Sequence, residues 1–286
     1  MELRVGRSIA GSVTIVLAVL LTGSAALPQA PTGKSDLKNM DLCNGVDRRS
    51  PEPQIRSCTA LINSGDLLAE GLAIAYNNRG DAYTARGDYD LAILDYDQSI
   101  KNKATYAKPF NNRGVAELKK GDYDRALRDL DEAIKLDPDY ASAFANRAEI
   151  YQRQNDFARA ARDYDETLRL KPDLNTAWKG RCWTRAVLGD LQLALADCNR
   201  AIQFEPDDAA THDSRGFIYL KMDQLNSSID DYNAALHFEP KLASALYGRG
   251  LAKRKKGDAT GANADIAAAK TIQAKISEDF VRYGIR

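Results

Sequence analysis

The sequence predicts an all-α fold, a right-handed α-solenoid of six 34-residue helix–turn–helix repeats with N- and C-terminal helical caps. The main observation is a strict period of 34 residues that two residue types keep without a slip. The arginines are Arg79, Arg113, Arg147, Arg181, Arg215 and Arg249, and the aspartates are Asp95, Asp129, Asp163, Asp197, Asp231 and Asp265. This period is typical of helix pairs that stack because no single unit can bury its apolar face alone.

Turn residues give the second observation, because they divide each unit into two amphipathic helices. Five units carry Gly-Asp or Asn-Asp at the turn, and Met222-Asp223-Gln224 is the exception. Glycine or asparagine ends a helix in the left-handed conformation, and the aspartate that follows can cap the next helix. Prolines near the ends of units two to five stop the second helix, whereas unit one has Ala104 there, so that junction could run on or bend differently.

The first 26 residues have the pattern of a secretory signal peptide. Arg4 and Arg7 precede an apolar run from Val13 to Leu21, and small residues follow up to Ala26. An uncleaved membrane anchor is the alternative, but Gly11, Ser12 and Thr14 leave the run short of the ~20 apolar residues that span a bilayer. We therefore expect an exported chain with no stable membrane insertion after cleavage.

The remaining elements follow in order. Residues 27–38 predict a flexible linker, 39–72 a degenerate N-terminal cap with a helix at 54–62, and 73–276 the six repeats. The units are 73–106, 107–140, 141–174, 175–208, 209–242 and 243–276. A helical stretch from Ala267 to Tyr283, ending in residues 277–286, is expected to cover the last repeat.

The packing positions of the units resemble those of the tetratricopeptide repeat. Small residues recur at the eighth, twentieth and twenty-seventh positions, as in Gly80, Ala92 and Ala133, and large ones at the fourth and twenty-fourth, as in Trp178 and Tyr164. The resemblance covers residues 73–276 and extends to exported bacterial members with Asn-Arg-Gly in their repeats. It implies a non-enzymatic scaffold, periplasmic or secreted, that binds a protein or peptide.

One departure from the family concerns the seventh position, which is usually leucine and here is always arginine. The periodic aspartate falls on the antiparallel partner helix. We interpret the twelve residues as a ladder of charge-assisted pairs that fixes register, although desolvation offsets much of the attraction. A binding role for the arginines is the alternative.

Four cysteines in an exported chain suggest two disulfides. Cys182 and Cys198 occupy the eighth and twenty-fourth positions of unit four, which face each other, and Cys43 with Cys58 would staple the N-terminal cap to its leader. Two buried free thiols in unit four are the alternative. Because Cys-x-x-Cys is missing from the sequence, a zinc site or thiol oxidoreductase is a weak interpretation.

The charge and motif content excludes several classes of function. Lysine plus arginine and aspartate plus glutamate both number 40, which argues against a nucleic-acid binder. The sequence has only His212 and His237, and it contains no nucleophile elbow, phosphate-binding loop or metal-ligand spacing. We predict no catalytic residue, no metal and no cofactor.

The resemblance also implies where a ligand would bind, because tetratricopeptide arrays line their concave face with the first helix of each unit. The predicted peptide-binding groove consists of Asn77, Asn78, Asn111, Asn112, Asn146, Trp183, Phe217 and Leu251. Amides can donate to and accept from a ligand backbone, and exposed aromatic residues can anchor it. The asparagines could equally be a solvated stripe, and the apolar residues could pack under a neighbouring helix.

Three functions remain open from the sequence. The first is an exported scaffold that binds a protein or peptide of unknown identity. The second is a self-assembling or structural subunit of an envelope complex. The third is an accessory to cell-wall or polysaccharide metabolism that contacts glycans through Trp183.

Overall fold

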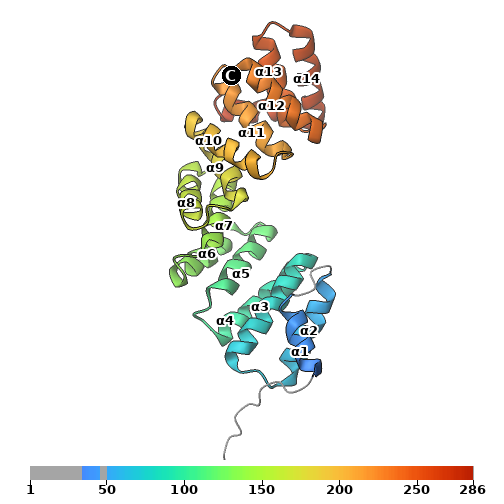
Figure 1. The fold of residues 1–286 in the computed structure, drawn as a ribbon, viewed down its shortest axis with the longest axis vertical. Coiled ribbons are helices and arrows are strands. Elements are labelled where there is room, and N and C mark those ends of the chain that lie inside the picture. The colour runs from blue at the N-terminus through green and yellow to red at the C-terminus, as the bar shows by residue number, and fades with distance from the viewer. Residues whose placement is uncertain (1–33, 46–49, 286) are drawn as a thin grey trace, which may run out of the picture.

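The structure is a computed structural model that describes residues 34–45 and 50–285. These residues form fifteen α-helices and no β-strand (Figure 1). The helices are α1 (Lys34–Cys43), α2 (Pro51–Ser64), α3 (Ala69–Arg86), α4 (Tyr89–Asn102), α5 (Ala107–Lys120), α6 (Tyr123–Leu136), α7 (Ala141–Arg153), α8 (Phe157–Leu170), α9 (Asn175–Leu188), α10 (Leu191–Phe204), α11 (Ala209–Lys221), α12 (Leu225–Phe238), α13 (Ala243–Lys255), α14 (Ala259–Ile272) and α15 (Ile276–Arg282).

The helix pairs α3–α4 to α13–α14 stack along the long axis of the molecule, one pair for each 34-residue unit (Figure 1). Each first helix contacts the first helix of the next unit, in the order α3, α5, α7, α9, α11 and α13. In the described chain, successive second helices have no comparable contact with one another. The first helices therefore form an inner layer, and the array curves around it. The predicted all-α solenoid is confirmed.

The turns between paired helices share one backbone conformation. Gly87, Gly121, Gly189 and Gly257 have φ of 90°, 84°, 95° and 90°. Asn155 and Asp223 take the same left-handed conformation in their units, with φ of 60° and 58°. Unit five is thus an exception in sequence but not in geometry, because aspartate tolerates this conformation better than most residues. The carboxylates of Asp122, Asp156 and Asp258 then cap the following helix.

Two other expectations about helix ends are corrected. The helix α4 ends at Asn102, the place equivalent to Leu136 of α6, although no proline follows. The stretch from Ala267 to Tyr283 is not one helix, because α14 ends at Ile272 and α15 starts at Ile276. Gln273 has a backbone conformation similar to that of the residue that ends the second helix of each other unit. Its N–H donates to Ala269 O. The repeat therefore ends before the terminal helix begins.

The N-terminal predictions meet the structure only in part. The predicted signal peptide and most of the linker lie outside the described residues. The last five linker residues, 34–38, belong to α1, so that part of the prediction is wrong. Among the helices that the structure describes, none is long and apolar enough to cross a membrane.

The arginine–aspartate ladder forms in all six units. In each, Nε and Nη2 donate to the two carboxylate oxygens of the aspartate sixteen residues later, at 2.7 to 2.9 Å. The hydrogen bonds that Arg113 and Arg147 donate to Asp129 and Asp163 are the largest cause of the raised pKa of these two arginines. The guanidinium groups therefore stay charged.

Each arginine after the first also contacts the preceding unit, which the sequence reasoning missed. Nη1 donates to a side-chain oxygen sixteen residues earlier: Asp97, Asp131, Asp165, Asn199 and Asn233 in turn. The ladder thus ties the two helices of a unit together and ties that unit to its neighbour.

The cysteines lie in the two predicted pairs, with the sulfur atoms of each pair at bonding distance. The Cα atoms are 4.8 Å apart for Cys43 and Cys58 and 5.2 Å apart for Cys182 and Cys198. All four side chains are buried. The first pair joins the end of α1 to α2, and the second lies between α9 and α10.

Candidate binding face

The N-terminal half of the inner layer carries a continuous chain of asparagine amides. Each amide nitrogen donates to the next amide oxygen in one direction, at 2.9 to 3.2 Å. The order is Asn146, Asn111, Asn112, Asn77, Asn78 and Asn44. The chain crosses from α7 through α5 and α3 to the turn after α1. Asparagine amides aligned in this way polarise one another, which strengthens each bond.

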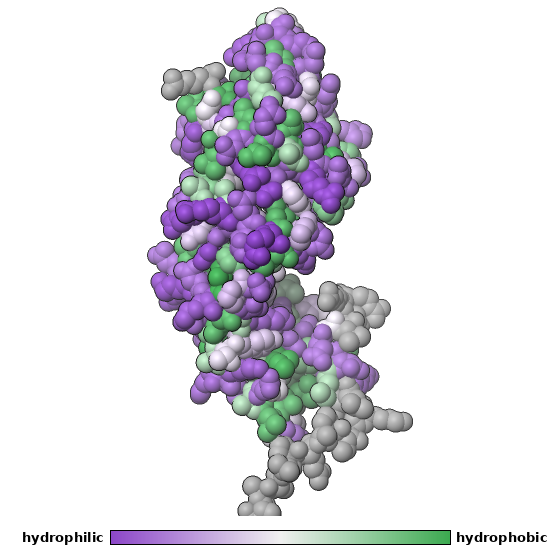
Figure 2. Space-filling view, turned by 60° about the vertical axis from the view of Figure 1, so that its left-hand side comes forward, coloured by the Kyte–Doolittle hydropathy of each residue, from purple (hydrophilic) through white to green (hydrophobic). Residues whose placement is uncertain are grey.

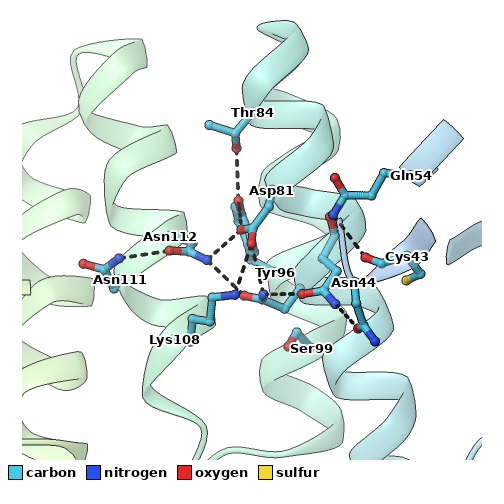
Figure 3. A network of polar contacts seen from close by, with 12 residues as sticks. Cys43, Asn44, Gln54, Asp81, Thr84, Tyr96, Ser99, Lys108, Asn111 and Asn112 are labelled. Carbon is cyan, nitrogen blue, oxygen red and sulfur yellow. Dashed lines mark hydrogen bonds and ion pairs between the residues drawn. The ribbon is translucent and has the colours of Figure 1, made fainter. Parts of the chain in front are cut away.

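A carboxylate and a lysine complete this polar network (Figure 3). Asp81 Oδ1 accepts from Asn112 at 2.7 Å and from the Tyr96 hydroxyl at 3.0 Å, and Lys108 Nζ lies 3.3 Å from Asp81 Oδ2. Burial, followed by the charge of Asp81, raises the pKa of Tyr96, so this phenol stays a hydrogen-bond donor. The groove predicted from the sequence did not include Asn44, Asp81 and Lys108, although Asp81 and Lys108 stand on first helices, at positions that line the concave face in tetratricopeptide arrays.

The five predicted asparagines are not equally available to a ligand. Asn77 and Asn111, at the fifth position, have exposed fractions of 0% and 5%. Asn78, Asn112 and Asn146, at the sixth position, are half-buried. The predicted contact of a ligand with Asn77 and Asn111 is therefore corrected: neighbouring first helices cover the fifth position, and these two amides support the chain from below.

The C-terminal half of the inner layer carries large apolar residues that other parts of the chain partly cover. Trp183 and Phe217 lie side by side with ring centroids 5.3 Å apart, and Leu251 packs against the same hydrophobic cluster. Phe280 of α15 contacts Phe217 at 5.7 Å, and Tyr283 contacts Trp183 at 5.1 Å. Phe217 is consequently only 3% exposed.

This covering corrects two expectations. The terminal helix does not merely cap the last repeat, because Tyr283 reaches back to Trp183 of unit four and to Phe157 of α8. Lys221 Nζ holds the end of the segment by donating to Tyr283 O at 3.1 Å. Phe217 and one side of Trp183 are therefore packed against the chain's own C-terminal segment, and Leu251 is partly buried against the same hydrophobic cluster.

Elsewhere on the surface, hydrophilic residues predominate and apolar ones occur in small groups on the face drawn in Figure 2. His212 is engaged within the fold, with Nδ1 3.2 Å from Asp231 Oδ1 and Nε2 2.9 Å from Pro206 O. In the described ranges, no group of three His, Cys, Asp or Glu side chains is arranged to hold a metal ion.

The paired helices, the inner layer and its polar face define a helical-repeat scaffold. The family model described as "TPR repeat" matches residues 80–121 and 116–155, and the one described as "Tetratricopeptide repeat" matches residues 146–209. Residues 80–209 therefore match tetratricopeptide repeats, and these matches indicate no enzyme family. No curated protein matches the chain.

Several solved structures share the fold. A tetratricopeptide repeat protein from Parabacteroides merdae is 18% identical with a TM-score of 0.60, over 88% of this chain and 99% of its own. YrrB, described as a TPR protein with an unusual peptide-binding site, is 20% identical with a TM-score of 0.54, over 66% and 95%. Pseudomonas aeruginosa pilF is 13% identical with a TM-score of 0.63, over 74% and 98%. At these identities the likeness concerns the fold.

Proposed function

We propose that the protein is an exported, non-enzymatic scaffold that binds a protein or peptide partner along the N-terminal half of its inner layer. The observation that carries the proposal is the chain of asparagine amides. Each amide along the chain donates one N–H group to the next asparagine, accepts from the previous one, or does both, and Asn112 also donates to Asp81. The remaining groups of Asn78, Asn112 and Asn146 are only half-buried, and the main chain of an extended peptide offers matching donors and acceptors.

The likeness to YrrB, a protein described as having an unusual peptide-binding site, supports the same function. The glycan alternative loses its main support, because Trp183 is packed against Phe217 and Tyr283 instead of forming an open platform.

Export is supported by the cysteine pairs, since disulfides persist in oxidising compartments. Peptide mapping of non-reduced protein from a bacterial periplasm should find Cys182 joined to Cys198 and Cys43 joined to Cys58. Free thiols at these positions would contradict export to an oxidising compartment, and a crossed pairing would contradict the described packing.

Partner binding is tested by capture from envelope extract with the chain that starts at residue 27. We expect one specific band that is lost with Asn112→Leu and weakened with Asn146→Ala, which removes a single bond at the end of the amide chain. The matched control is Asn263→Ala, an exposed asparagine on the outer helix α14, which should retain the band. Capture of the protein by itself alone would favour self-assembly, and a band that survives both variants would contradict the proposed site.

A further inference from the structure

A cavity of about 330 Å³ lies between α15 and the first helices of units four to six. Trp183, Phe217, Phe280 and Tyr283 form its aromatic wall, and Asp213 of α11 and Asp279 of α15 supply carboxylates. The rings contact one another in edge-on and tilted pairs, so the wall is held rigidly. The sequence reasoning did not single out Asp213.

The two carboxylates differ in how their charge is balanced. Asp279 accepts from Gln273 Nε2 at 2.7 Å and lies 3.4 Å from Arg282 Nη1. Asp213 accepts only from Ser244 Oγ, at 2.6 Å, and no lysine or arginine of the described chain forms an ion pair with it.

The other groups near Asp213 do not supply a positive charge. Lys179 of α9 forms ion pairs with Glu205 and with Asp208, and its Nζ lies 2.9 Å from Asp208 Oδ1. Glu239, between α12 and α13, adds a negative charge, and Tyr232 of α12 is neutral and fully buried. Burial raises the pKa of Asp213 to about 7, and the charge of Glu239 adds to this effect. The carboxylate is therefore held in a partly desolvated wall without a counter-charge.

We propose that this cavity binds an organic cation, the ammonium or guanidinium group of a lysine or arginine side chain or of a free amine. Aromatic rings attract cations through their quadrupole, and the Asp213 carboxylate adds a direct ion pair. An anion would be repelled, and a purely apolar ligand would leave the carboxylate further desolvated. A metal ion is disfavoured because the described residues hold no third ligand of suitable type nearby.

Where the cation is a side chain of the partner, the inference rests on the proposed function. It then places one end of the partner at the asparagine chain and a basic residue of the partner at the aromatic cavity. A free amine would use the same cavity without any contact to the asparagines.

The experiment follows the two indole N–H resonances by NMR while the complete chain is titrated with n-butylammonium. Trp183 lies in the cavity wall, whereas Trp178 Nε1 donates to Pro172 O at the start of α9 and serves as an internal reference. We expect the Trp183 resonance to shift in a saturable way and Trp178 to stay in place. The uncharged analogue n-butanol should bind at least about tenfold more weakly.

Asp213→Asn should weaken n-butylammonium binding about tenfold, and Asp223→Asn, an exposed aspartate in the turn after α11, should leave it unchanged. Binding should also weaken between pH 8 and pH 5, because Asp213 becomes protonated. Equal affinity for butanol and butylammonium, or full affinity in Asp213→Asn, would overturn the inference.

A second titration separates the two sources of the cation. A lysine-containing peptide that binds more tightly than n-butylammonium, and that loses this advantage with Asn146→Ala, assigns the cavity to a partner side chain. Equal affinity assigns it to a free amine. The two proposals can fail separately. If the asparagine variants no longer capture the partner but still bind n-butylammonium, the cavity binds cations independently of the asparagine chain.

Discussion

The two halves of the inner layer solve the problem of an exposed helix face in opposite ways. In the N-terminal half, polar amides bond to one another and leave part of each sixth-position asparagine open. In the C-terminal half, large apolar rings are covered by the chain's own last helix. The same repeat therefore presents a ready hydrogen-bonding surface at one end and a closed, cavity-bearing surface at the other.

The largest effect is expected from Phe280→Ala, which removes the ring that covers Phe217 and Tyr247. Loss of a buried phenylalanine should destabilise the docked state of α15 by about 3 kcal/mol. Hydrogen exchange should show faster exchange for residues 276–282 and unchanged exchange for α3 and α5. Val281→Ala, on the exposed side of the same helix, should change little; equal effects of the two variants would mean that α15 does not seal this half.

The ladder underlies both halves, and Arg147→Leu should cost about 3 kcal/mol because it strands the nearly buried Asp163. Arg215→Leu should cost less, because His212 remains 3.2 Å from Asp231. Chemical denaturation of both variants gives the comparison. A double-mutant cycle of Arg147→Leu with Asp163→Leu should show strong coupling, and independent effects would remove the pairing.

Asn77→Leu should cost about 2 kcal/mol, because it removes the acceptor of one Asn112 N–H group and the donor to Asn78 Oδ1 in the middle of the amide chain. Thermal denaturation compared with Asn263→Leu, an exposed outer position, isolates this cost. If Asn77→Leu and Asn263→Leu were equally stable, the amide chain would not contribute to the stability of the fold.

The smallest effect is expected from Asp213→Asn, and it depends on pH. The pKa of this carboxyl is about 7 in the folded protein, above its unfolded value of about 4. Below pH 4 the group is protonated in both states, whereas above pH 7 the folded state must hold a charge that burial disfavours. A pKa difference of about three units corresponds to about 4 kcal/mol, but Asp213 is only half-buried and solvent screens its charge. The variant should therefore be more stable than the parent at pH 8 by roughly 1 kcal/mol and nearly equal to it at pH 4. A gain that is the same at both pH values would contradict this account.

Sequence periodicity predicted the repeat, the turns and the pairing of Arg147 with Asp163, because each depends on contacts that recur in every unit. The sequence also contained a signal for the bond from each arginine Nη1 to the preceding unit, because Asp97, Asp131 and Asp165 keep the 34-residue period. This signal is weaker, because two other units carry asparagine at that position. The fold-back of α15 could not be predicted in this way, because Phe280 and Tyr283 occur once. Burial of Asn77 and Asn111 depends on how closely neighbouring first helices approach, which spacing alone does not show.

Because of the ladder, an array of this kind can change its length by gaining or losing whole units. Each unit supplies one arginine that reaches forward within the unit and backward to the preceding one, together with the acceptors for itself and its successor. A copied or deleted 34-residue unit therefore regenerates the ladder contacts at each new junction, whereas an insertion of a few residues within a helix would move its arginine or its acceptor out of register. The ladder makes the number of repeats adjustable while it keeps their register fixed.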